Sequence, residues 1–210
     1  MNDLDAEELF YLAMKASDEG NREKTISLLK QSVATEPTAN ALYILGAEYA
    51  ELGMHERAID FISRALVIDP SLETARFQLG LLYMASGLVQ DSRRVFEPLL
   101  QLDNDIYLHQ FALGMTQLLD ENVEGAIQCL NVGIELNSEN EALNRDMRNV
   151  IVEIRSISHD DLLDDDMYAE SMAAIKEAPV PAQAIQQTPI AAGDRTHLLV
   201  SKYGESEDSD

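Results

Sequence analysis

Glycine recurs along this chain at a nearly constant interval, and this recurrence constrains the fold more than any other feature of the sequence. Gly20, Gly53 and Gly87 are 33 and 34 residues apart, and Glu121 stands where a fourth glycine would fall. Two further series keep the same interval. They are Ala13, Gly46, Gly80 and Gly114, and then Pro37 and Pro70 with Asn104 and Ser138 in the later proline places. A shared period of about 34 residues predicts a stacked helix–turn–helix unit.

The second of these units shows the repeat pattern most fully. Its pattern residues are Leu42, Leu45, Gly46, Tyr49, Ala58, Ile62 and Pro70. The same places hold Leu9, Leu12, Ala13, Ala16, Thr25, Leu29 and Pro37 in the first unit, and Arg76, Leu79, Gly80, Tyr83, Ser92, Phe96 and Asn104 in the third. In the fourth they hold Gln110, Leu113, Gly114, Gln117, Ala126, Leu130 and Ser138. Over about residues 5–138 the chain resembles the tetratricopeptide repeat family.

The resemblance implies an all-α fold, a right-handed α-solenoid of four helix–turn–helix repeats. We place the repeats at about residues 6–38, 39–72, 73–106 and 107–140, each with a helix A followed by a helix B. Small residues such as Gly46 let the two helices of a repeat pack closely. Gly20, Gly53 and Gly87 favour a left-handed turn after helix A, and Pro37 and Pro70 end helix B.

A capping helix is predicted over about residues 140–157, which completes a repeat domain of residues 1–157. Ser138 and Glu141 form a capping-box pattern. Met147, Val150, Ile151 and Ile154 give this helix one apolar face. Beyond it, residues 158–177 have the pattern of an acidic amphipathic helix. For residues 178–210 we expect a disordered linker and an acidic, flexible tail.

The charge of the chain excludes some classes of partner. The formal net charge is −23, so nucleic acid and anionic membrane surfaces are poor partners. A basic partner and a merely solvated surface both remain open. No secretory signal or membrane-spanning run is visible, and Cys129 is the single cysteine. We therefore expect a cytoplasmic protein without membrane insertion.

No set of residues in the sequence has the spacing of a catalytic or metal-binding site. The four histidines do not pair with each other or with Cys129 at helical spacing. The glycines are scattered one to a turn and do not form a phosphate-binding loop. We expect no enzyme activity, no cofactor and no metal site.

The family resemblance implies that helix A of each repeat lines a concave face. One place after the conserved bulky residue stands the aromatic row of Phe10, Tyr43, Phe77 and Phe111. Four residues further stands the apolar row of Met14, Ala47, Leu81 and Met115, and Met84 and Leu118 follow a turn later. Family members that clamp acidic chaperone tails have Lys, Asn and Arg here, so this chain does not resemble them in specificity. The rows are either packing between repeats or a groove for a partner.

The hypothesis is a protein–protein interaction module, a scaffold or adaptor that binds a partner peptide or helix in an apolar concave groove. Two alternatives stay open: a dedicated chaperone that guards an apolar segment of a secreted or assembly-bound client, and an accessory subunit that docks onto a catalytic chain. A homo-oligomer is a further option. The apolar segment His197–Tyr203 either shields the groove, docks elsewhere or does neither.

Overall fold

The structure, a computed structural model, describes residues 4–160 of the 210-residue chain, with side chains described through residue 156. All secondary-structure elements within this range are helices. The first two repeats comprise α1 (Ala6–Asp18), α2 (Arg22–Thr35), α3 (Ala39–Glu51) and α4 (His55–Ile68). The next two comprise α5 (Glu73–Ala85), α6 (Val89–Phe96), the 3₁₀ turn η1 (Leu99–Gln101), α7 (Tyr107–Leu119) and α8 (Val123–Leu136). The last helix is α9 (Glu141–Asp160).

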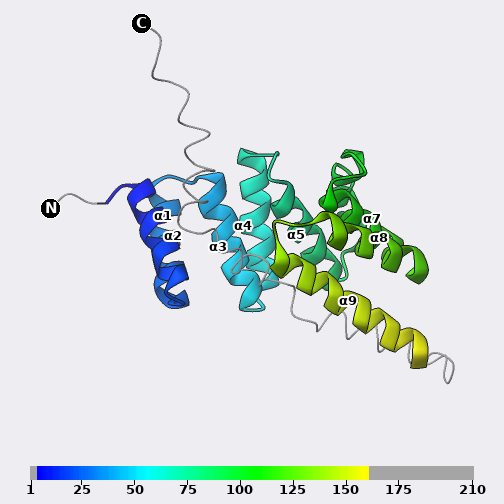
Figure 1. Ribbon diagram of the computed structural model, residues 1–210. Helices are drawn as coiled ribbons and strands as arrows, with labels where there is room; N and C mark the ends of the chain where they lie inside the picture. Colours follow the sequence, from blue (N-terminus) through cyan, green and yellow to red (C-terminus); the bar gives the residue numbers. More distant parts are fainter. Residues whose placement is uncertain (1–3, 161–210) are drawn as a thin grey trace, which may run out of the picture.

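The helices form antiparallel pairs that stand side by side in chain order (Figure 1). Helix A and helix B of each repeat contact each other, and helix B then contacts helix A of the next repeat. One continuous apolar core runs from Ala13 and Leu29 in the first repeat to Ile154 in α9. The α-solenoid expected from the 34-residue period is confirmed.

The turns between helix A and helix B have the predicted left-handed backbone. Gly20, Gly53 and Gly87 have φ angles of 73°, 69° and 72°. Glu121 keeps the same turn in the fourth repeat with a φ of 61°, although it carries a side chain. This conformation costs a non-glycine residue about 1–2 kcal/mol. The repeat geometry therefore outweighs the local preference of Glu121.

The small residue of helix A sits where helix B comes closest. A Cβ atom added at Gly46 would lie 2.6 Å from the Ile62 side chain, and one at Gly80 would lie 2.2 Å from the Phe96 ring. At Gly114 the added atom would lie 2.9 Å from Leu130. Any side chain at these places would push helix B away from helix A.

Helix B of the third repeat is shorter than its counterparts, which the 34-residue pattern did not predict. α6 ends at Phe96, and η1 follows after Pro98. Proline has no backbone N–H, and its ring clashes with the carbonyl of the preceding turn, so an α-helix cannot continue through it. Pro37 and Pro70 stand at the proline place of their repeats, whereas Pro98 comes before that place, Asn104, in the third repeat and therefore ends helix B early.

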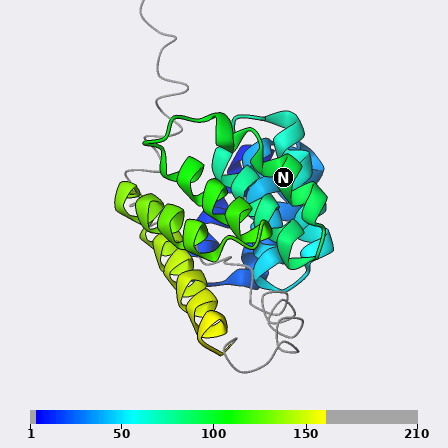
Figure 2. The ribbon, with the colours of Figure 1, turned by 90° about the vertical axis from the view of Figure 1, so that its right-hand side faces the viewer.

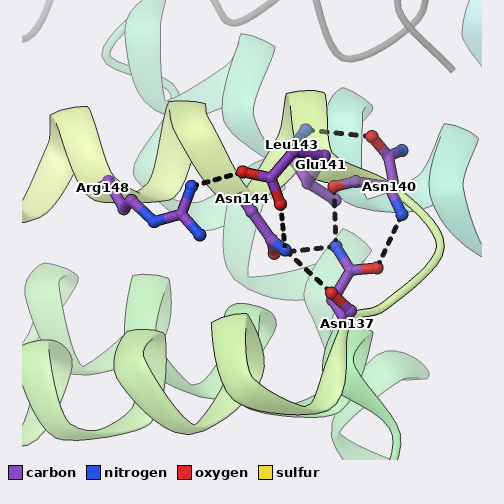
Figure 3. A network of polar contacts seen from close by, with 6 residues as sticks. All are labelled: Asn137, Asn140, Glu141, Leu143, Asn144 and Arg148. Carbon is purple, nitrogen blue, oxygen red and sulfur yellow. Dashed lines mark hydrogen bonds and ion pairs between the residues drawn. The ribbon is translucent and has the colours of Figure 1, made fainter.

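α9 lies beside α8 at the C-terminal end of the stack (Figures 1 and 2). Its start differs from the prediction, because the cap is not the pair of Ser138 and Glu141. The Asn140 side chain accepts a hydrogen bond from the Leu143 N–H at 2.9 Å, and Glu141 instead pairs with Arg148 at 2.7 Å (Figure 3). Asn140 directly precedes Glu141, the first residue of α9, so its side chain reaches the unpaired N–H groups of the first turn.

The helix expected over residues 158–177 lies outside the described residues, apart from the end of α9 at Asp160. The tail expected over residues 178–210, including His197–Tyr203, also lies outside them.

Candidate binding face

Burial divides the residues proposed for the groove into two groups. Phe77, Leu81, Phe111 and Met115 are buried by the chain itself, and so is Ala47. The half-buried group consists of Phe10, Met14, Tyr43, Met84 and Leu118. Of the two interpretations of the rows, packing between repeats therefore applies to most of their residues in the third and fourth repeats, and to Ala47 in the second.

Ring packing explains why the aromatic row is inaccessible there. The Phe77 ring centroid lies 5.7 Å from that of Phe96 and 6.0 Å from that of Phe111. Phe111 also fills the space over Gly133 on α8, where an added Cβ would meet its ring at 2.4 Å. Aromatic pairs at these separations add to the free energy of burial. Phe77 and Phe111 therefore hold the third and fourth repeats together.

Gly133 is the signal in the sequence that would have revealed this packing. A glycine inside a helix costs about 1 kcal/mol relative to alanine, so it needs a packing reason. Gly133 lies outside the repeat pattern, so the pattern alone did not point to it. Its absent side chain leaves the room that Phe111 occupies.

Tyr43 on α3 interacts electrostatically with Tyr107 on α7, two A helices further along the chain. Burial raises the pKa of the Tyr43 hydroxyl, and the neighbouring Tyr107 raises it further. Tyr43 and Tyr107 thus lie in the same region of the stack, although they belong to different A helices.

Tyr107 was not among the predicted site residues, although it lies one helical turn before Phe111. Burial raises the pKa of Tyr107, a hydrogen bond with Thr74 lowers it, and the Glu139 and Glu73 carboxylates raise it. Its ring meets Phe111 edge-on at 5.8 Å. Tyr107 therefore connects Thr74 on α5 with Phe111 on its own helix.

One of the helix pairs has the sequence of a known repeat. Residues 39–72, which span α3 and α4, match the sequence model of the tetratricopeptide repeat. Residues 39–72 therefore form a tetratricopeptide repeat. The other helix pairs repeat the geometry of the matched one, with the left-handed turn and the close helix contact at the same places.

Solved structures of MamA share the fold of these tetratricopeptide repeats. A crystal structure of MamA aligns with a TM-score of 0.53 at 23% identity, covering 62% of this chain and 77% of that one. MamA 41-end from Desulfovibrio magneticus RS-1 aligns with a TM-score of 0.55 at 18% identity, covering 82% of this chain and 93% of that one. No curated protein sequence shows significant similarity to this chain.

The repeats offer little for chemistry in the described part of the chain. Cys129 on α8 is half-buried, and burial raises the pKa of its thiol, although a backbone hydrogen bond lowers it. A raised pKa disfavours the thiolate that a nucleophile needs. Among residues 4–160, no three His, Cys, Asp or Glu side chains gather as metal ligands. No helix in this range is long and apolar enough to cross a membrane.

Proposed function

We propose that the protein is a non-enzymatic scaffold or adaptor. Its concave face, which helix A of each repeat lines, binds an apolar segment of another protein. The half-buried apolar side chains that remain in the three inner rows of the A helices carry this proposal. They are Phe10 and Met14 on α1, Tyr43 on α3, Met84 on α5 and Leu118 on α7. Stacked repeats use such concave faces for binding.

The energy available on this face suits a moderate affinity. Fully burying one large apolar side chain is worth about 1.5–3 kcal/mol, and these side chains have already lost part of that surface. Three or four further burials therefore support a moderate affinity at most, because the costs of association offset much of the gain. Methionine adapts to partners of different shape, so Met14 and Met84 suit a binding face that accepts sequence variation.

The experiment is an affinity capture from native extract with the full chain, followed by mass spectrometry. One bait is unmodified, one carries Phe10→Ala with Met84→Ala, and a control carries Val67→Ala on α4, where the side chain is 82% exposed. We expect a partner that the unmodified chain and the control retain and that the double variant loses. Equal capture by all three baits contradicts the proposed face.

A titration of the purified partner then measures the effect directly. Two truncated contacts should weaken binding by about tenfold or more. Phe77 and Phe111 are unsuitable test positions because they are fully buried, and truncating a buried phenylalanine costs about 3–5 kcal/mol of stability. Thermal unfolding of each variant shows whether lost binding reflects a lost fold. The chaperone and accessory-subunit alternatives concern the identity of the partner, which the capture reports.

A further inference from the structure

The outer face of α1 carries an exposed aromatic side chain between two opposite charges. Tyr11 is 70% exposed, with Glu8 three residues before it and Lys15 four residues after it. This spacing places all three on one stripe of the helix. Leu4, which precedes the helix by two residues, is 46% exposed. α1 stands at one end of the stack (Figure 1).

The equivalent stripe is covered in the A helices α3, α5 and α7 and in α9. In α3, α5, α7 and α9, the residues equivalent to Glu8 are Ala41, Ala75, His109 and Leu143. Those equivalent to Tyr11 are Ile44, Gln78, Ala112 and Asp146. Those equivalent to Lys15 are Glu48, Leu82, Thr116 and Val150. Each of these side chains is buried or half-buried. The stripe is therefore the face on which a preceding repeat packs, and among residues 4–160 nothing covers it in α1.

The charges on this stripe are complementary to those of a second copy of the same stripe. In the described part of the chain neither Glu8 nor Lys15 forms an ion pair. If two α1 helices pair antiparallel about a two-fold axis at Tyr11, Glu8 of each copy faces Lys15 of the other. The two Tyr11 rings then meet at the axis, where an amphipathic ring gains most from burial.

We propose that this α1 face is a homodimer interface, with a second copy of the chain as its occupant. The arrangement is a closed two-fold dimer because the opposite end of the stack is covered by α9, so repeats cannot continue from one copy to the next. Helix pairing around one aromatic residue buries less than a standard interface, so the dimer is weak. The surface is separate from the proposed peptide-binding face, and either proposal stands or fails without the other.

Analytical ultracentrifugation of the full chain over a wide concentration series tests the proposal. We expect a reversible monomer–dimer equilibrium with a dissociation constant of roughly 10–500 µM. Tyr11→Glu should weaken dimerisation by about tenfold or more, because it adds two like charges at the axis. A chain that stays monomeric throughout, or a Tyr11→Glu variant that dimerises like the unmodified chain, overturns the proposal.

Charge variants test the antiparallel pairing itself. Lys15→Glu and Glu8→Lys should each weaken self-association, because each variant places like charges opposite one another. An equimolar mixture of the two should dimerise again, since every facing pair is then opposite in sign. Arg155→Glu on α9 and Glu124→Lys on α8 are exposed controls with the same changes in net charge, and both should dimerise normally. A mixture that remains monomeric refutes the proposed pairing.

Glu8 also takes part in the capping box of α1, where its carboxylate accepts a hydrogen bond from the Asp5 N–H at 3.0 Å. The Glu8→Lys variant therefore needs a thermal unfolding curve of its own. The mixture controls for a loss of helix stability, because it compares dimerisation of the Glu8→Lys variant alone with its dimerisation in the presence of the Lys15→Glu variant.

Discussion

Arg93 on α6 donates a hydrogen bond to the carbonyl oxygen of Leu119, the last residue of α7, at 2.9 Å. Its guanidinium also donates to the Asp120 carboxylate at 2.6 Å. The last carbonyls of a helix have no partner within the helix, and a cation is favoured there. Arg93 therefore ties helix B of the third repeat to the end of helix A in the fourth.

A similar connection joins the first two repeats through different acceptors. Arg22 at the start of α2 forms ion pairs with Glu48 and Glu51 in the last turn of α3. In both cases an arginine from helix B holds the end of the next helix A. Such contacts contribute to the interface energy between neighbouring repeats, on which the stability of a repeat protein depends.

Arg93→Ala should destabilise the domain by about 1–2 kcal/mol, because two charge-assisted hydrogen bonds are lost at a half-buried site. Chemical denaturation followed by circular dichroism measures the change. Arg94→Ala is the matched control, since the Arg94 side chain is 77% exposed and, among the described residues, pairs with Asp91 on its own helix. An exposed pair of this kind is worth less than about 1 kcal/mol. Equal midpoints for the two variants contradict the role assigned to Arg93.

Glu121→Gly should stabilise the protein by about 0.5–1 kcal/mol, because the turn holds Glu121 in the left-handed region at a φ of 61°. The gain is smaller than the full conformational penalty, since glycine loses more backbone freedom on folding. Differential scanning calorimetry measures it as a higher melting temperature.

The reciprocal change provides the control for Glu121. Gly53→Ala should destabilise the protein by about 1 kcal/mol. An added Cβ at Gly53 meets no atom within 4 Å, so the cost comes from the φ of 69° and not from a clash. Unchanged melting in both variants contradicts the explanation from backbone conformation.

Asn137→Ala should cost about 2–4 kcal/mol, because it breaks a buried network between α8 and α9 (Figure 3). The Asn137 amide group donates to the Asn140 carbonyl oxygen and to the Asn144 side chain, both at 2.9 Å. Its oxygen accepts from the Asn140 N–H at 2.9 Å. Asn131→Ala on α8 is the control, since that exposed side chain donates a hydrogen bond within its own helix, to the Ile127 carbonyl oxygen. Urea denaturation compares the two variants, and similar midpoints refute the role of the network.

Periodicity predicted the architecture because the repeat places have local causes. The left-handed turn at Gly53 and the close contact at Gly46 depend on single residues, and both are found as expected. The break at Pro98 also has a local cause, but it falls outside the repeat pattern. The repeat pattern specifies no residue at position 98, so it did not predict this break.

The accessibility of the candidate site was harder to predict, because it depends on the repeats on either side. Phe10 and Phe77 occupy the same repeat place, yet Phe10 is half-buried and Phe77 fully buried. The difference arises from Phe96 and Phe111, which contact Phe77 from two other helices. A pattern within one repeat shows where a side chain points, but contacts between repeats decide how much of it remains exposed.

Asp146 on α9 should make stability fall as the pH rises from about 4 to about 6. Its side chain is 8% exposed, and burial raises its pKa to about 6, although the nearby Arg145 opposes the shift. Among the described residues, none donates a hydrogen bond to its Oδ2 atom. The folded state therefore holds a proton on Asp146 over a pH range in which the unfolded chain has released it, so deprotonation favours unfolding.

Asp146→Asn removes this titration and keeps the size of the side chain. Relative to the unmodified protein, the variant should gain stability on going from about pH 4 to about pH 7, by on the order of 2 kcal/mol. Urea denaturation at a series of pH values measures this difference, and other titrating groups cancel in the comparison. Asp60→Asn on α4 removes an exposed carboxylate that pairs with Arg64, and it is the control for the loss of one negative charge. A difference between Asp146→Asn and the unmodified protein that stays constant with pH contradicts the buried, protonated carboxyl.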